Sequence, residues 1–161
     1  RAACCIGADR AAVAVGTFDG ALTALDARSG QPRWSIRAAA LPRDAAIEVT
    51  RLDGDILVRC ARQLVRVTTD GSVAWRHRFE DDDLVTSVRP TKRRLLATGR
   101  CVREGQFEAF VETLDPETGM SDGRTLLAVP WGRFNLVPSE DGLLVTCPQS
   151  VRLLRPAPAK P

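Results

Sequence analysis

The side chains in this 161-residue sequence that could bind a metal or act as nucleophiles include five cysteines and one histidine. Thiolates and imidazole nitrogens bind zinc, and a thiolate beside a histidine can act as a nucleophile. The cysteines form no Cys-x-x-Cys pair, and His77 alone cannot complete a zinc ligand set with them. No Ser/His/Asp or Cys/His arrangement can be assembled around His77 either. We therefore expect no catalytic residues, no cofactor-binding residues and no metal ligands.

Three of the cysteines recur at one place in the strand pattern of the sequence. Cys60, Cys101 and Cys147 each fall near the end of the second strand in a group of strands. Small residues in such places fill tight, buried space, so we expect their thiols to be reduced and poorly reactive. His77 falls on the outermost strand of its group, and we expect it to lie on the surface.

Charged residues occur in two short runs. The acidic run 80–83 could bind calcium, but contiguous carboxylates lack the alternating ligand spacing of calcium loops. We expect a solvated loop there, and a basic cluster, Arg89 with residues 92–94, that offsets it. The chain has 23 Lys and Arg against 20 Asp and Glu, a net charge of +3, which does not favour binding to nucleic acid. No apolar run approaches the ~18 residues of a membrane span.

A repeat of turn residues and tryptophans organises the rest of the sequence. Each turn ends in glycine, which readily takes the left-handed conformation, and an acid in the turn can accept hydrogen bonds from nearby backbone amides. The turn glycines are separated by 41 and 48 residues, which matches the ~40–50 residues of a four-stranded propeller blade. In the first two repeats a tryptophan follows the glycine by four residues, and in the third Gly123 holds that place. The residues predicted to form this structural repeat are Asp26, Gly30, Trp34, Gly71, Trp75, Asp115 and Gly119.

Short apolar blocks broken every 8–12 residues by Gly, Pro or Asp predict an all-β fold. We expect a β-propeller segment of about four four-stranded antiparallel blades, part of a larger ring, over residues 1–155. The predicted blades span about 1–40, 41–83, 84–130 and 131–155, and the last lacks its outer strand. The proline-rich tail 156–161 ends the strand pattern, because proline removes ladder donors.

The stretch 24–34 resembles the blade repeat of the propellers of pyrroloquinoline-quinone (PQQ)-dependent dehydrogenases and their non-catalytic relatives. The residues that match that family's Ala-x-Asp-x-x-Thr-Gly-x-x-x-Trp motif are Ala24, Asp26, Ser29, Gly30 and Trp34, with serine for threonine. The resemblance implies that the tryptophan docks onto the neighbouring blade. It also implies a quinone-facing disulfide for the adjacent pair Cys4 and Cys5. However, the polar run that follows such a pair in the family is missing, and four blades cannot enclose the quinone and its calcium ion.

The sequence therefore predicts a non-catalytic propeller scaffold or protein-interaction module, part of a larger bacterial protein or complex, and not an enzyme. Two alternatives stay open: a fragment of a PQQ-dependent dehydrogenase, and a ligand-sensing propeller attached to a signalling domain. The expected partner is another protein or a second propeller arc, including a homodimer that closes the ring. Open blade faces motivate this expectation, because proteins normally cover exposed sheet edges and large apolar patches.

Overall fold

The computed structural model describes residues 2–6, 12–16, 21–36, 47–60, 62–91, 93–127, 135–139, 142–147 and 150–154. Every helix or strand within these ranges is a β-strand, so the all-β prediction is confirmed. No helix in these ranges is long and apolar enough to cross a membrane. Lys92 and the proline-rich tail lie outside the described residues, as do the side chains of Cys4, Cys5 and Cys147.

The strands form four sheets. The first sheet contains β1 (Ala2–Ile6), β2 (Ala12–Gly16), β3 (Leu22–Asp26) and β4 (Pro32–Ile36). The second sheet contains β5 (Ile47–Leu52), β6 (Asp55–Cys60), β7 (Gln63–Val67) and β8 (Val73–Arg78). The third sheet contains β9 (Leu84–Pro90), β10 (Leu95–Arg103), β11 (Gln106–Leu114) and β12 (Ser121–Leu127). The fourth sheet contains β13 (Asn135–Ser139), β14 (Gly142–Cys147) and β15 (Ser150–Leu154).

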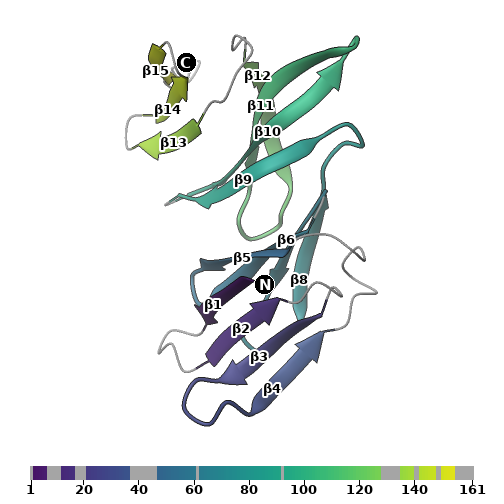
Figure 1. The fold of residues 1–161 in the computed structure, drawn as a ribbon, viewed down its shortest axis with the longest axis vertical. Coiled ribbons are helices and arrows are strands. Elements are labelled where there is room, and N and C mark those ends of the chain that lie inside the picture. Colours follow the sequence, from purple (N-terminus) through teal and green to yellow (C-terminus); the bar gives the residue numbers. More distant parts are fainter. Residues whose placement is uncertain are drawn as a thin grey trace.

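Each sheet is an antiparallel meander in which every strand pairs with the next one in sequence. The chain finishes one sheet before it starts the next, and the sheets follow one another in sequence order from β1–β4 at one end to β13–β15 at the other (Figure 1). Four successive meanders of this kind are the architecture of propeller blades. The predicted propeller segment is therefore confirmed at the level of its fold.

The second sheet is buried on both faces. Residues alternate between the two faces along a strand, so Ile56, Val58 and Cys60 of β6 pack with the first sheet while Leu57 packs with the third. One hydrophobic cluster thus fills the space between the first and second sheets, and another lies between the second and third. Cys60 and Cys101 are buried and neither is in a disulfide, which agrees with the burial expected from their positions.

Candidate functional site

The turn between β11 and β12 is held by its acidic first residue. Asp115 Oδ1 accepts hydrogen bonds from the backbone amides of Glu117 (2.9 Å) and Thr118 (2.8 Å), and from the Thr118 hydroxyl (3.0 Å). These bonds, led by the Thr118 amide, hold the pKa of Asp115 below its usual range. The turn closes at Gly119, whose φ of 70° lies in the left-handed region that glycine favours.

The turn between β3 and β4 repeats this geometry bond for bond. Asp26 Oδ1 accepts from the amides of Arg28 (3.0 Å) and Ser29 (2.9 Å) and from the Ser29 hydroxyl (3.0 Å), and Gly30 has the same φ of 70°. A 2.7 Å bond from Arg33 is added here. Arg33 first, and then Ser29, hold the pKa of Asp26 well below its usual range.

The turn between β7 and β8 is shorter. Its glycine, Gly71, donates to the Thr68 carbonyl at 3.0 Å and has a φ of 91°. Asp70, one residue before the glycine, accepts from the Ser72 amide at 3.2 Å and from the Thr68 hydroxyl. A different local sequence therefore builds a third glycine turn at the same place in its sheet.

Trp75 of β8 docks on the 115–119 turn of the next sheet. Its indole Nε1 donates a 2.9 Å hydrogen bond to the Pro116 carbonyl, and its ring covers Gly119. A Cβ at Gly119 would lie 2.5 Å from the ring, so the contact requires glycine there for its lack of a side chain as well as for its φ. The tryptophan is 8% exposed, which makes this contact part of the hydrophobic core.

Trp34 of β4 makes the equivalent contact one sheet earlier. Its Nε1 donates a 2.8 Å hydrogen bond to the Thr69 carbonyl, and a Cβ at Gly71 would lie 2.8 Å from its ring. In both cases the tryptophan comes from the outer strand of one sheet and the glycine from the turn of the following sheet. Each contact therefore joins one sheet to the sheet that follows it in the sequence.

A β-bulge places each docking residue. Between the third and fourth strands of the first three sheets, the register shifts once, next to the pairs Ala24–Trp34, Arg66–Trp75 and Thr113–Gly123. Bulges re-aim a side chain out of the regular ladder. Gly123 holds the docking position of the third sheet but has no side chain with which to reach the fourth.

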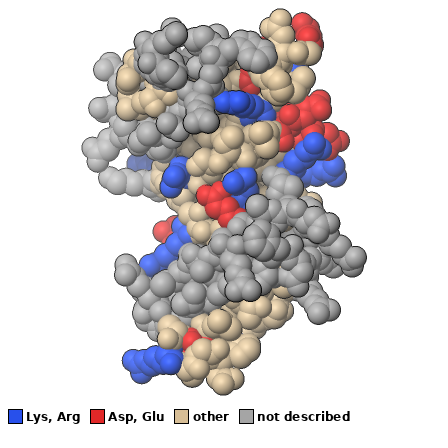
Figure 2. Space-filling view, viewed as in Figure 1, with Lys and Arg blue, Asp and Glu red and all other residues tan. Residues whose placement is uncertain are grey.

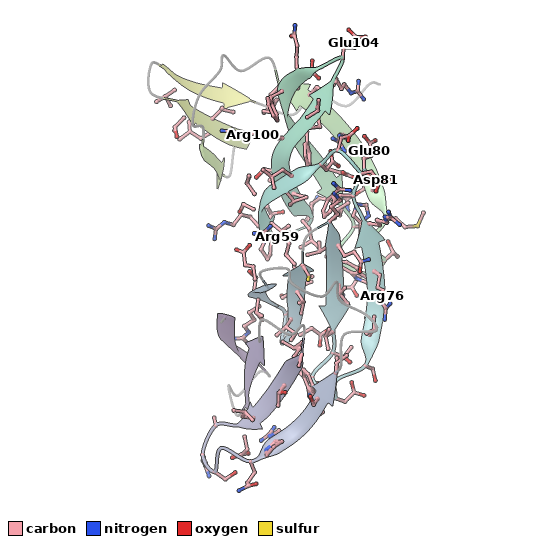
Figure 3. The ribbon with its side chains drawn as sticks, turned by 45° about the vertical axis from the view of Figure 1, so that its right-hand side comes forward. Arg59, Arg76, Glu80, Asp81, Arg100 and Glu104 are labelled. Atoms are coloured by element: carbon pink, nitrogen blue, oxygen red, sulfur yellow. The ribbon has the colours of Figure 1, made fainter. Side chains whose placement is uncertain are left out.

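Two arginines of the second sheet strengthen its junction with the third. Arg66 is held by Asp55 at 2.8 Å and donates to both the Pro116 carbonyl (2.9 Å) and Glu117 (2.8 Å). Arg59, which lies at the junction in Figure 3, donates to the Val85 carbonyl at 2.7 Å. Such charge-assisted bonds add orientation to the apolar contact.

Charged residues also cluster where the second and third sheets meet. Their positions correct two expectations, one for Asp83 and one for His77. Asp83, predicted in a solvated loop, has a fully buried side chain that accepts two hydrogen bonds from Arg124, at 2.6 and 2.7 Å. The other residues of that run differ, since the side chains of Glu80 and Asp81 are 66% and 72% exposed. Arg124 also lies over the Phe110 ring, 4.0 Å from its centroid.

His77, predicted on the surface, instead lies between the second and third sheets. Its side chain is 13% exposed, its Nε2 lies 3.4 Å from Glu112 Oε1, and its ring meets Phe79 edge-on. The outer strand is covered here because the next sheet packs against it. Burial by itself would raise the pKa of Glu112, but His77, Ser121 and Arg124 outweigh it and the pKa lies below its usual value.

Arg94 of the basic cluster, which was expected to offset the acidic run, pairs elsewhere. Arg94 pairs with Asp122 at 2.8 Å, within its own sheet, while Asp81 pairs with Arg78 at 2.9 Å. Basic and acidic side chains are consequently interspersed over the middle of one face (Figure 2). No local motif distinguishes Asp83, Glu112 or Arg124 in the sequence, which is why sequence reasoning missed them.

Of the residues predicted from the sequence, the structure brings Trp34 to Gly71 and Trp75 to Gly119. Asp26 and Gly30 form their turn, but apart from Gly30 and its two chain neighbours no described residue has an atom within 4 Å of a Cβ built at Gly30. No group of three His, Cys, Asp or Glu side chains that could hold a metal ion occurs in the part of the chain that the structure describes.

No protein-family model matches the chain, and no curated protein matches it in sequence. Several solved structures, however, are similar to it in fold. BamB from Moraxella catarrhalis is similar with a TM-score of 0.55 and 19% identity, over 87% of this chain and 41% of that chain. The quinohemoprotein alcohol dehydrogenase from Comamonas testosteroni is similar with a TM-score of 0.54 and 18% identity, over 72% of this chain and 19% of that one.

A complex of the fission yeast SREBP and SCAP binding domains is similar with a TM-score of 0.51 and 14% identity, over 88% of this chain and 41% of that chain. At these identities the comparisons show the fold alone, which is that of a β-propeller. This chain spans less than half the length of each of these proteins.

Proposed function

We propose that this chain is a non-catalytic arc of a β-propeller that presents a surface to another protein, as part of a larger bacterial protein or complex. The division of residues 1–155 into four blades belongs to this proposal. The proposal is supported by the polar side chains described above, which hold turns and join strands and sheets. Asp26 and Asp115 hold turns, Arg59 and Arg66 join the second sheet to the third, and Arg124 binds the buried Asp83 carboxylate, so each of these groups has a structural contact.

The hairpin of β10 and β11 is the part of the structure that we expect to contact the partner. β9 pairs with β10 only from Leu95 to Arg100, and β12 pairs with β11 only from Ala109 to Leu114. Residues 101–108 therefore continue as a two-stranded extension, and Glu104 lies at its end (Figure 3).

An apolar strip lies along one face of this hairpin. Val102 stands directly opposite Phe107, and Leu84 stands opposite Arg100 on the same face, because residues two apart in a strand share a face. Leu84, Val102 and Phe107 are 65%, 39% and 57% exposed. Contiguous exposed apolar residues next to polar ones are typical of protein-interaction surfaces.

The test is affinity purification of the tagged full-length protein from its own cells, with Phe107→Ser and a matched Met120→Ser control. Met120 is 69% exposed and lies outside the strip. We expect at least one stoichiometric protein to be recovered with the wild type and the control but lost with Phe107→Ser. If no recovered protein depends on Phe107, the strip is not the interaction surface.

A fragment of a quinone-dependent dehydrogenase is the second candidate, favoured by the fold shared with the Comamonas enzyme and by Cys4 and Cys5, which are consecutive residues of β1. Titration of the protein with pyrroloquinoline quinone and calcium, followed by a dye-linked alcohol oxidation assay, tests it. Saturable quinone binding with turnover would establish this candidate in place of the scaffold. A ligand-sensing propeller attached to a signalling domain is a further alternative, which the sequence outside residues 1–161 would test.

A further inference from the structure

We propose that a strand of the partner protein adds to an open edge of β10 at Val102, with an apolar residue opposite Val102 and a basic residue directly after it. The inference rests on the proposed function, because it names the form of partner that the strip of Leu84, Val102 and Phe107 accepts. It goes further in assigning part of the binding to backbone hydrogen bonds. Its basis is a strand edge without a neighbour that lies beside this strip, between a basic and an acidic side chain.

The edge of β10 on the side of β9 is longer than β9 itself. β9 begins at Leu84, opposite Arg100, whereas β10 continues to Arg103 and rises past the start of β9 (Figure 1). The chain does not extend β9 backwards along this edge, because it arrives from the second sheet through a turn in which Asp83 N donates to the Glu80 carbonyl at 3.1 Å. Among the described residues, no strand pairs with the last three residues of β10 on this side.

Val102 is the residue whose backbone groups face this open side. A two-residue turn of Glu104 and Gly105, with φ values of 50° and 75°, joins β10 to β11 in the manner of a type I′ hairpin. The pair beside such a turn, Arg103 and Gln106, is hydrogen-bonded across the hairpin, and hydrogen-bonded pairs alternate along an antiparallel ladder. The N–H and C=O of Val102 therefore point away from β11. An unpaired edge of this kind is a template for strand addition.

The register also places the apolar strip beside the added strand. Residues directly opposite each other in a sheet have their side chains on the same face, so a partner residue opposite Val102 shares its face. That residue then has Val102 directly across from it and Phe107 one strand further. Leu84 lies in line with it, because an added strand continues the line of β9. An apolar side chain at this position covers all three exposed residues, and we therefore expect one there.

Charged side chains at the two ends of the open edge set the order of residues in the partner. Arg103 is exposed at the end near the hairpin turn, and Asp82 is exposed at the other end, two residues before Leu84. Within the described residues Asp82 has no ion pair, whereas its neighbour Asp81 is already paired. An antiparallel strand makes both hydrogen bonds from the one residue opposite Val102, and it runs from Arg103 toward Asp82. We therefore expect an acidic, an apolar and a basic residue in that order.

The first experiment selects short random peptides, displayed on phage, for binding to the purified full-length protein. The library is counter-selected against Val102→Pro, which removes the open N–H without removing a ladder bond to β11. We expect the enriched peptides to share the order acidic, apolar, basic. The proposal is overturned if no peptide is enriched over the counter-selected variant, or if the basic residue precedes the apolar one.

The second experiment does not depend on how a protein variant folds. An enriched peptide is synthesised with an N-methyl group on its apolar residue, which removes the N–H that donates to the Val102 carbonyl. We expect its affinity, measured by fluorescence anisotropy, to fall about tenfold. The matched control carries the N-methyl group on the basic residue, whose N–H points away from β10, and should bind almost as well as the unmodified peptide. Equal losses in the two peptides would contradict strand addition.

A charge exchange tests the order of residues, and the two proposals can fail separately. Asp82→Lys should weaken binding of the enriched peptide, and replacing the basic residue of the peptide by glutamate should restore it; loss without restoration would refute the contact with Asp82. If the partner recovered from cells depends on Phe107 but peptide binding survives N-methylation of the apolar residue, the strip is the interaction surface and strand addition is wrong. If peptides bind as expected but no recovered protein depends on Phe107, the proposed function fails instead.

Discussion

The substitution of alanine for Gly119 measures the docking contact, because the chain contains its own control. Gly119 and Gly30 close the same turn with the same φ of 70°, but only Gly119 lies under a tryptophan ring. A left-handed alanine costs about 1–2 kcal/mol at either position. Gly119→Ala also places a Cβ 2.5 Å from the Trp75 ring, which must move away.

The extra cost has two parts. Overpacking of a tight site costs about 1–3 kcal/mol, and the lost bond from Trp75 to the Pro116 carbonyl costs about 1 kcal/mol. We therefore expect Gly119→Ala to lower the free energy of unfolding by about 2–4 kcal/mol more than Gly30→Ala. Urea unfolding of residues 1–161 followed by circular dichroism measures both variants. Equal losses in the two variants would refute the reasoning that the ring, and not the backbone conformation, selects glycine at position 119.

Three further perturbations test the buried residues. Arg124→Met leaves the Asp83 carboxylate buried without its partner and should cost about 3–5 kcal/mol in urea unfolding, while adding Asp83→Asn should recover part of that loss. Folding lowers the pKa of Glu112 from its ordinary value of 4.5. The ionised Glu112 therefore stabilises the folded protein above pH 4.5, and this contribution is lost as the pH falls through the lower pKa of the folded state. Urea midpoints measured on both sides of that value should thus depend less on pH in Glu112→Gln. Burial raises the pKa of the Cys60 thiol, and Cys101 is also buried. Both should therefore react with a thiol reagent only after denaturation, and rapid labelling of Cys60 or Cys101 in the native protein would contradict their burial.

The elements of this fold could be predicted because their signals are local. The Asp26 and Asp115 turns are specified within five residues, where the acid, the hydroxyl and the glycine each have a fixed task. The strands between them are specified by short apolar blocks and by turn residues. Spacing of the turn glycines then sets the period of the repeat, so the order of the blades followed without any long-range information.

Contacts between blades could not be predicted in the same way. Asp83 and Arg124 are 41 residues apart, and their pairing depends on the register of β12 and on how the loop before β9 turns inward. His77 was expected on the surface because outer strands commonly face solvent. In the middle of an arc, however, the following sheet covers that strand and brings Glu112 to it. The acceptors of the two indoles, Thr69 and Pro116, are backbone carbonyls and leave no signal in residue type.

If residues 1–161 form one arc of a propeller, other protein must cover its apolar faces. Half-buried Leu25 at the first sheet and the exposed strip of Leu84, Val102 and Phe107 at the third are the surfaces that such a completion would cover. Sedimentation equilibrium of the purified chain over a wide concentration range measures whether these faces associate. We expect a mass that rises with concentration as uncovered arcs associate. A single monomeric species at every concentration would contradict it, because it would mean that these faces need no partner.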